Sequence, residues 1–309
     1  MKGREVMEFN KIVCIDKTGL EPWAIEELKK YSIKPIELFD DYPENDNEII
    51  NRIKYADCVL VSWNTQISKK VIENCKQLKY IGMCCSLYDE NSANIDIKIA
   101  RVNNIEVRGV RDYGDEGLVE FIISELIRLL KGLGEHQWRN EAVELTQRKI
   151  GIIGMGTTGR MLARMASAFG MKIYYFSRSR KMDIEKEGIE YLPLNELLKT
   201  VEIISIHLPK NTVILGKDEF DLFGDGKILI NTSLGTPFEV PAFLEWIQRK
   251  GNYAIYDEDG AGSYKNEFEK YSNVILSKKV AGWTKEARER LSIKVLKNIQ
   301  EVLNELNVQ

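Results

Sequence analysis

The sequence predicts an α/β protein with two domains, each built on a parallel sheet. Short apolar segments of strand length alternate with amphipathic segments of helix length along most of the chain. This alternation is typical of parallel sheets that are covered by helices on both faces. The length of 309 residues is sufficient for two separate hydrophobic cores.

The first hundred residues contain five strand candidates separated by helix candidates. The strands are expected at Lys11–Ile15, Lys34–Phe39, Cys58–Val61, Tyr80–Cys84 and Ile105–Arg108. The helices are expected at Trp23–Tyr31, Glu48–Tyr55, Ser68–Asn74 and Ile95–Asn103. This order predicts a flavodoxin-like α/β domain.

A glycine-rich turn follows the apolar strand candidate Ile150–Gly154, and a helix candidate (Arg160–Phe169) and a second strand (Lys172–Phe176) come next. The turn has the spacing G-x-G-x-x-G, in which the glycines allow a tight turn, close approach to a pyrophosphate and helix–strand packing. The helix N-terminus offers free N–H groups to phosphates. We therefore predict a Rossmann-type doubly wound domain whose cofactor contacts include Gly154, Met155, Gly156, Thr157, Thr158 and Gly159.

Strand–helix alternation continues to the end of the chain. Helices are expected at Leu194–Lys199, Lys217–Phe223 and Val240–Lys250, and strands at Val201–His207, Lys227–Asn231, Tyr253–Asp257 and Val274–Leu276. A final helix, from Thr284 to about Leu306, is long enough to reach back to the first domain. We therefore predict a discontinuous substrate domain, residues 1–112 and 285–309, around an NAD(P)-binding domain, residues 113–284.

A long helix is expected from Glu116 to about Arg139. Its apolar positions (Leu118, Phe121, Ile122, Leu126, Leu129 and Leu130) are more numerous than one surface stripe requires. This suggests burial between domains or against a second subunit, and we expect a homodimer joined through this helix.

The composition is that of an ordinary soluble protein, with 29% charged and 44% hydrophobic residues and a net charge of −3. Neither nucleic acid nor a membrane is indicated as a partner, since no basic excess and no apolar run of roughly 20 residues is present. The N-terminus has no apolar signal-peptide region. The five cysteines lack C-x-x-C spacing and indicate reduced thiols and a cytoplasmic location.

The end of the second strand, near Ser177, is where a Rossmann-type domain reads the adenine ribose. An acidic residue there favours NAD(H), whereas arginine accepts the 2′-phosphate of NADP(H). Here Ser177 is followed by Arg178, Ser179, Arg180 and Lys181, which could form a phosphate site or simply a basic surface turn. We expect NADP(H) to be preferred, with NAD(H) possible.

Several motifs resemble the D-2-hydroxyacid dehydrogenases. Besides the glycine turn, these are Leu118–Phe121, Ser205–Pro209 (S-I-H-L-P), Ile230–Ser233 (I-N-T-S) and Ala281–Thr284 (A-G-W-T). The resemblance implies hydride transfer between a nicotinamide cofactor and a 2-keto or 2-hydroxy acid. For this chain we expect a small-molecule substrate, which is a carbonyl compound, such an acid or an imine. The resemblance places further cofactor contacts at His207, Leu208, Pro209, Thr232, Ser233, Leu234 and Asp257.

The catalytic positions depart from this family. The resemblance implies an arginine after I-N-T-S, a histidine before the A-G motif and a supporting glutamate, but this chain has Leu234, Lys279 and Gly262. Glu258 or Asp259 could substitute for the glutamate. Lys279 could polarise a carbonyl or transfer a proton, or could be a solvated lysine beside Lys278. We favour the solvated alternative, because no orienting partner is visible, and keep Lys279 as the one catalytic candidate.

Two functions follow from these observations. The first is an NAD(P)-dependent oxidoreductase acting on CH–OH donors. The alternative is a catalytically silent dinucleotide-binding sensor or regulatory protein, which the loss of three catalytic groups favours, but we prefer the oxidoreductase.

Overall fold

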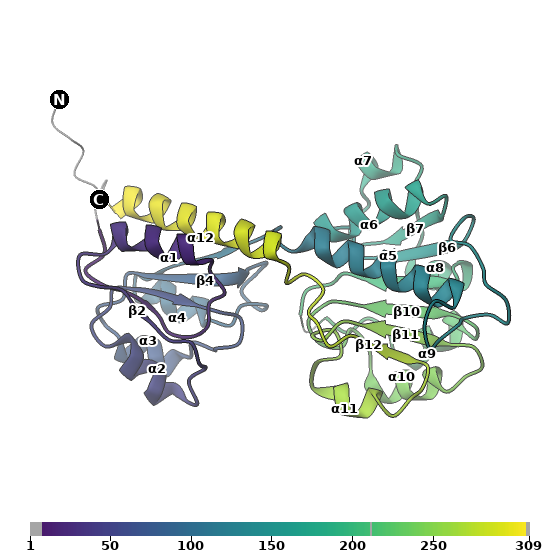
Figure 1. Ribbon diagram of the computed structural model, residues 1–309, viewed down its shortest axis with the longest axis horizontal. Coiled ribbons are helices and arrows are strands. Elements are labelled where there is room, and N and C mark those ends of the chain that lie inside the picture. The colour runs from purple at the N-terminus through teal and green to yellow at the C-terminus, as the bar shows by residue number, and fades with distance from the viewer. Residues whose placement is uncertain (1–7, 211, 307–309) are drawn as a thin grey trace. The chain divides into compact units, whose positions relative to one another are not determined.

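The computed structural model describes residues 8–210 and 212–306. The chain forms two compact units, one comprising residues up to Tyr113 and from Lys285 onward, the other Gly114–Thr284 (Figure 1). Each unit contains one sheet whose paired strands are all parallel. The predicted α/β class with two parallel sheets is therefore confirmed.

The first unit has the strand order β2-β1-β3-β4-β5, which is the flavodoxin-like order. Its strands are β1 (Ile12–Cys14), β2 (Glu37–Leu38), β3 (Cys58–Val61), β4 (Tyr80–Ser86) and β5 (Glu106–Val110). Its helices are α1 (Pro22–Leu28), the 3-10 turn η1 (Lys29–Tyr31), α2 (Asp46–Ile53), α3 (Lys69–Asn74), α4 (Ile97–Val102) and α12 (Lys285–Leu306). Helix α12 buries Leu291, Val295 and Ile299 in the core of this unit, so the final helix returns to the first sheet.

The second unit has the strand order β12-β11-β10-β9-β6-β7-β8, a doubly wound sheet that starts in the middle at β6. Its strands are β6 (Lys149–Ile153), β7 (Lys172–Phe176), β8 (Glu190–Tyr191), β9 (Ile203–Ile206), β10 (Ile228–Asn231), β11 (Tyr253–Tyr256) and β12 (Val274–Leu276). Its helices are α5 (Asp115–Lys131), α6 (Thr157–Ala168), α7 (Met182–Glu185), α8 (Leu194–Thr200), α9 (Lys217–Phe223), α10 (Val240–Ile247), η2 (Gly262–Tyr264) and α11 (Lys265–Phe268).

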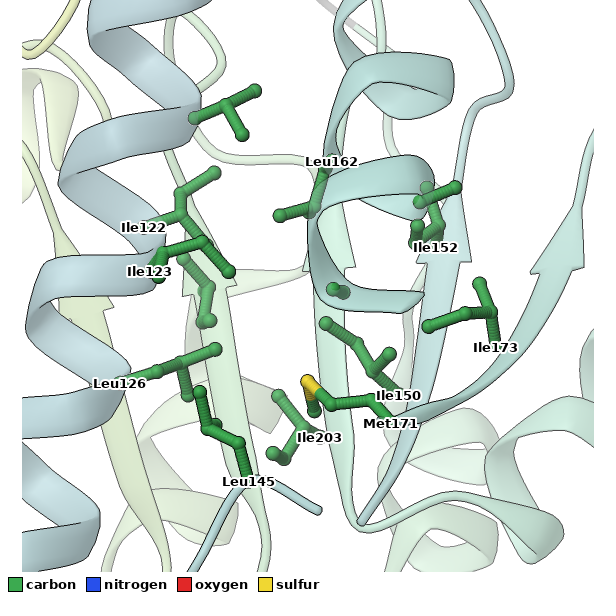
Figure 2. Packing of buried hydrophobic residues seen from close by; sticks show 14 of the residues in the cluster. Ile122, Ile123, Leu126, Leu145, Ile150, Ile152, Leu162, Met171, Ile173 and Ile203 are labelled. Atoms are coloured by element: carbon green, nitrogen blue, oxygen red, sulfur yellow. The ribbon is translucent and has the colours of Figure 1, made fainter. Parts of the chain in front are cut away.

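The long helix α5 is shorter than the sequence predicted. It ends at Lys131 instead of Arg139 because Gly132 has a φ of +66°, which stops the helix in the left-handed conformation. The buried face of α5 packs on its own sheet, where Ile122 and Leu126 lie over Ile150 together with Leu162 of α6 (Figure 2). Much of the apolar excess of this helix is therefore accounted for within the unit.

Other predicted boundaries differ from the observed ones by a few residues, and the short elements β8, α7, η2 and α11 were not predicted. All five cysteines are free and buried. Burial raises the pKa of the Cys14 and Cys85 thiols to about 12, so these sulfurs remain protonated. Among the described residues, no helix has the combined length and apolar character that a membrane crossing requires.

Candidate functional site

The predicted cofactor residues gather at one edge of the second sheet. The strand order reverses between β6 and β9, and in a doubly wound sheet ligands bind at the carboxyl ends of the strands beside such a reversal. The segments that leave β6, β9, β10 and β11 at this edge begin at Gly154, His207, Thr232 and Asp257. Four adjacent parallel strands thus place these segments next to one another.

The three glycines of the turn have three different environments. Gly154 has a φ of +99°, and a Cβ atom there would lie 2.1 Å from the His207 carbonyl oxygen. A Cβ on Gly159 would lie 2.1 Å from the Gly154 carbonyl oxygen, whereas a Cβ on Gly156 would meet nothing within 4 Å. Gly154 and Gly159 are therefore required by the fold itself, and Gly156 leaves open space beside the backbone, as approach to a pyrophosphate requires.

The N-terminus of α6 begins at this open space. Its N-cap, Gly156, provides no side-chain cap, so the first-turn amides face the turn without a side-chain acceptor at the cap position. Thr157 is exposed, but the Thr158 hydroxyl donates a hydrogen bond to Asp115 of α5. Thr158 is thus held by another helix of the unit. The Asp115 partner was not identified from the sequence, although its place at the start of α5 suits a carboxylate.

The loops after β9 and β10 are joined by Ser233. Its hydroxyl donates to the Ile206 carbonyl at 3.0 Å and accepts from the Leu208 amide at 3.1 Å. Asn231 is fully buried, and its Nδ2 donates to the carbonyl oxygens of Gly235 and Gly260, each at 2.8 Å. Sequence reasoning missed Asn231 as an organising residue, although it stands inside the I-N-T-S motif.

Asp257 fixes the loop after β11. Its two carboxylate oxygens accept from the amides of Gly260 and Ala281, both at 2.9 Å. Burial is the largest cause that raises the pKa of Asp257 to about 6. Burial is also the largest cause that raises the pKa of Asp259 to about 6, and the negative charge of the nearby Glu258 is the second. Asp257 therefore has a demonstrable structural role in holding the A-G motif against β11.

Two side chains at this edge have properties that suit a bound polar ring. The Thr232 hydroxyl is buried and has no hydrogen-bond partner among the described residues. His207 lies 2.9 Å from the Ser205 hydroxyl through Nε2, and burial lowers its pKa to about 4, so it is neutral at pH 7. An unpaired hydroxyl, open space at Gly156 and an uncapped helix N-terminus together fit a nicotinamide dinucleotide.

The basic residues after β7 do not all have the same surroundings. Arg180 bonds Glu185 through Nε at 3.1 Å, and its guanidinium lies 5.2 Å from the centre of the Tyr191 ring. Lys181 Nζ donates to Ser179 Oγ at 3.0 Å. Arg178 is exposed, and in the part of the chain that the structure describes it has no ion pair.

The three positions where the family resemblance implies catalytic groups lie in neighbouring loops. Leu234 is 38% exposed. The amide of the next residue, Gly235, lies 3.5 Å from the carbonyl oxygen of Asp259, which belongs to the loop after β11. Gly262 has a φ of +54° and its amide donates to the same carbonyl at 3.1 Å. Lys279 is exposed, and its backbone is held by Ser277 and by the Glu258 amide, whereas its side chain has no partner among residues 8–210 and 212–306.

No group of three or more His, Cys, Asp or Glu side chains suited to a metal ion occurs in residues 8–210 and 212–306. The groups at this edge that can take part in chemistry include backbone amides, hydroxyl groups, the neutral His207 and the ionisable groups of the β11 and β12 loops.

Residues 122–277 match the family profile described as D-isomer specific 2-hydroxyacid dehydrogenase, NAD binding domain. The chain is 30% identical over 277 residues to the glyoxylate reductase of Thermococcus litoralis, covering 81% of this chain and 82% of the relative. It is 26% identical to the hydroxypyruvate reductase of Blautia hydrogenotrophica, covering 95% and 97%.

Among solved structures, an acyclic imino acid reductase, Bsp5, in complex with NADPH and D-Arg is similar with a TM-score of 0.82. That protein is 29% identical, and the match covers 96% of this chain and 97% of the other. The sequence profile, the relatives and the glycine turn agree on one assignment. The chain belongs to the D-isomer specific 2-hydroxyacid dehydrogenase family, and it is an oxidoreductase with a nicotinamide dinucleotide cofactor.

Proposed function

We propose that this protein is an NADP(H)-dependent reductase of a small 2-imino acid, with the corresponding 2-keto acid as a poorer substrate. One observation carries this choice: Leu234 and Lys279 stand where the family resemblance implies an arginine and a histidine. A carbonyl oxygen that gains a hydride at its carbon must also receive a proton from an acid. A protonated imine already carries that proton on nitrogen, so its reduction does not require the histidine. The similar imino acid reductase supports the same class.

The proposed cofactor contacts follow the edge of the second sheet. The backbone of Gly154–Gly159 and the first turn of α6 would hold the pyrophosphate, and Ser177–Arg180 the adenosine end. His207–Pro209, Thr232–Leu234 and Asp257 would line the nicotinamide end, with the Thr232 hydroxyl free to bond the carboxamide. Bound there, the nicotinamide supplies the hydride. Met155 is buried and can contribute only its backbone.

We further propose residues 113–284 as the NADP(H)-binding domain and residues 1–112 with 285–309 as the substrate domain. A cytoplasmic location is proposed from the five unpaired cysteines. Lys279 remains the catalytic candidate, because its exposed ammonium follows β12 at the same edge of the sheet as the other site segments.

A homodimer is proposed through the outer face of α5. Between α5 and α6 lies an apolar surface hollow of about 380 Å³ lined by Glu120, Ile123, Ser124, Ile127, Arg128, Met165 and Phe169. Phe169, one of these lining residues, is 44% exposed. An apolar hollow of this kind, whose lining also includes polar residues, suits an interface with a second copy.

The substrate class is tested by NADPH oxidation with a panel of 2-keto acids, each assayed alone and with ammonia or methylamine to form the imine. We expect oxidation to be much faster with the amine than with the keto acid alone. Equal rates without it would instead assign a keto acid reductase, and no oxidation despite tight NADPH binding would contradict the proposed activity. Lys279→Ala separates a chemical role of this lysine from a solvated one, because only a chemical role predicts a lower rate.

The cofactor preference is tested by the dissociation constants of NADPH and NADH for the wild type and Arg178→Ala. We expect the wild type to prefer NADPH and the substitution to weaken NADPH binding about tenfold or more, the size of a lost charge-assisted hydrogen bond. Lys186→Ala is the matched control, since Lys186 is an exposed cation farther along the same segment. A wild type that prefers NADH would overturn the preference.

A further inference from the structure

We infer that Tyr175 and Glu185 are positioning residues that set the NADPH-to-NADH affinity ratio, because they fix the loop at residues 177–181. The inference rests on the proposed cofactor site, whose adenosine end this loop would form. Neither residue stands in the loop itself. Each acts through the groups that it holds.

Tyr175 binds the C-terminal end of the loop through its hydroxyl group. It lies on β7 with its side chain fully buried, and its hydroxyl accepts a hydrogen bond from the Lys181 amide at 2.6 Å. The same hydroxyl donates to Glu185 Oε1 at 2.7 Å. One phenol therefore ties the end of β7 both to the end of the loop and to α7.

Glu185 holds Arg180 at the other side of the loop. Both carboxylate oxygens accept from the Arg180 guanidinium, and this bond, followed by the one from Tyr175, lowers the pKa of Glu185. The guanidinium also lies over the Tyr191 ring. The charge of Arg180 is thus paired within the unit, and Arg178 remains the arginine that can turn toward an anion.

Helix α7 is itself joined to α6 by one further ion pair, and the residues just after α7 by another. Asp183 binds Arg160, with one N–O distance of 3.1 Å, and Glu187 binds Arg164 at 2.7 and 2.9 Å. Because α6 begins at the glycine turn, the Asp183–Arg160 pair holds α7, and with it Glu185, in a defined place relative to the proposed pyrophosphate site. The loop is therefore pre-organised before any ligand binds.

The loop carries charge as well as shape. Because Glu185 pairs with Arg180, the loop and α7 offer a 2′-phosphate fewer unpaired positive charges than the sequence Arg178–Lys181 implies. Loss of the Tyr175 hydroxyl should disorder the loop and weaken NADPH binding, whereas loss of the Glu185 charge should release Arg180 and strengthen it. NADH, which lacks the 2′-phosphate, should respond much less to either change.

The experiment measures NADPH and NADH dissociation constants by the fluorescence of the reduced cofactors, without substrate, for the wild type, Tyr175→Phe and Glu185→Gln. We expect NADPH to bind about fivefold more weakly to Tyr175→Phe, the size of one lost hydrogen bond. We expect it to bind more tightly to Glu185→Gln, most clearly at low salt. NADH binding should change less than twofold.

Glu187→Gln is the matched control, because it breaks the neighbouring pair with Arg164 and touches neither Tyr175 nor Arg180. An unchanged ratio in both Tyr175→Phe and Glu185→Gln overturns the inference, and so does an equal change in Glu187→Gln. If Tyr175→Phe does not fold, the affinity ratio of Glu185→Gln alone tests the inference. The wild-type ratio tests the proposed preference for NADP(H) separately, since it does not depend on any variant.

Discussion

The carbonyl oxygen of His207 occupies the space that a side chain on residue 154 would need. It lies 2.1 Å from the position of a Cβ atom at Gly154, far inside any real contact. Because His207 follows β9 and Gly154 follows β6, this approach brings together the two strands between which the sheet order reverses. The glycine turn and the loop after β9 are therefore packed directly against each other, backbone to backbone.

Two glycine substitutions should consequently affect different properties, one the stability and the other the cofactor affinity. Gly154→Ala should lower the free energy of unfolding by more than about 2 kcal/mol, because it combines a backbone clash with a φ of +99°. Gly156→Ala should cost at most about 1 kcal/mol, the usual difference between glycine and alanine at an N-cap, but should weaken NADPH binding at least about tenfold, because its Cβ fills the open space. Denaturant unfolding and cofactor titration check both. Unchanged NADPH affinity in Gly156→Ala would remove the turn from the proposed site.

The fold and the turn could be predicted because they depend on local pattern. Strand periodicity and glycine spacing determine backbone geometry directly, which is why the expected elements lie close to β6, α6 and β7. The end of α5 was missed because it depends on the backbone conformation of Gly132 and on the Gln137 side chain that packs beside it. The pairing of Arg180 with Glu185 was missed because α7 is only four residues long and leaves no periodic signal.

Asn231→Ala should destabilise the second unit more than the same substitution at an exposed asparagine does. The substitution leaves the buried carbonyl of Gly260, the partly buried carbonyl of Gly235 and the Ser233 amide without their side-chain partner, so we expect a loss of about 2–4 kcal/mol. Asn266→Ala, at an exposed position, is the control and should change stability by less than about 0.5 kcal/mol. Thermal and denaturant unfolding measure both, and equal stabilities would show that these hydrogen bonds contribute nothing.

His207 should make stability depend on pH between its two pKa values. Burial lowers its pKa from the usual 6.5 to about 4, so between these values the unfolded chain binds a proton that the folded chain does not. The free energy of unfolding should therefore fall as the pH drops from 6.5 to 4, by up to about 3 kcal/mol from this group. His207→Gln should lack that contribution, and the difference between the two pH profiles isolates it, because Asp257 and Asp259 titrate in both proteins.

His136→Gln provides the matched control for the pH profile, since His136 is the other histidine of the chain. If the wild type and His207→Gln lose stability in parallel between pH 6.5 and 4, the imidazole is not desolvated in the folded protein.

The proposed dimer predicts a specific effect of a charge at the α5–α6 hollow. Phe169→Glu should leave the fold intact, because the side chain is 44% exposed, but should convert a dimer to a monomer, since a carboxylate would be buried without a partner in the interface. Light scattering coupled to size exclusion measures the mass, and Val102→Glu, 78% exposed on the first unit, is the control. A variant that stays dimeric would place the interface elsewhere, and a wild type that is already monomeric at micromolar concentration would contradict the proposed homodimer. The apolar lining by Ile123, Ile127 and Met165 would then need another occupant.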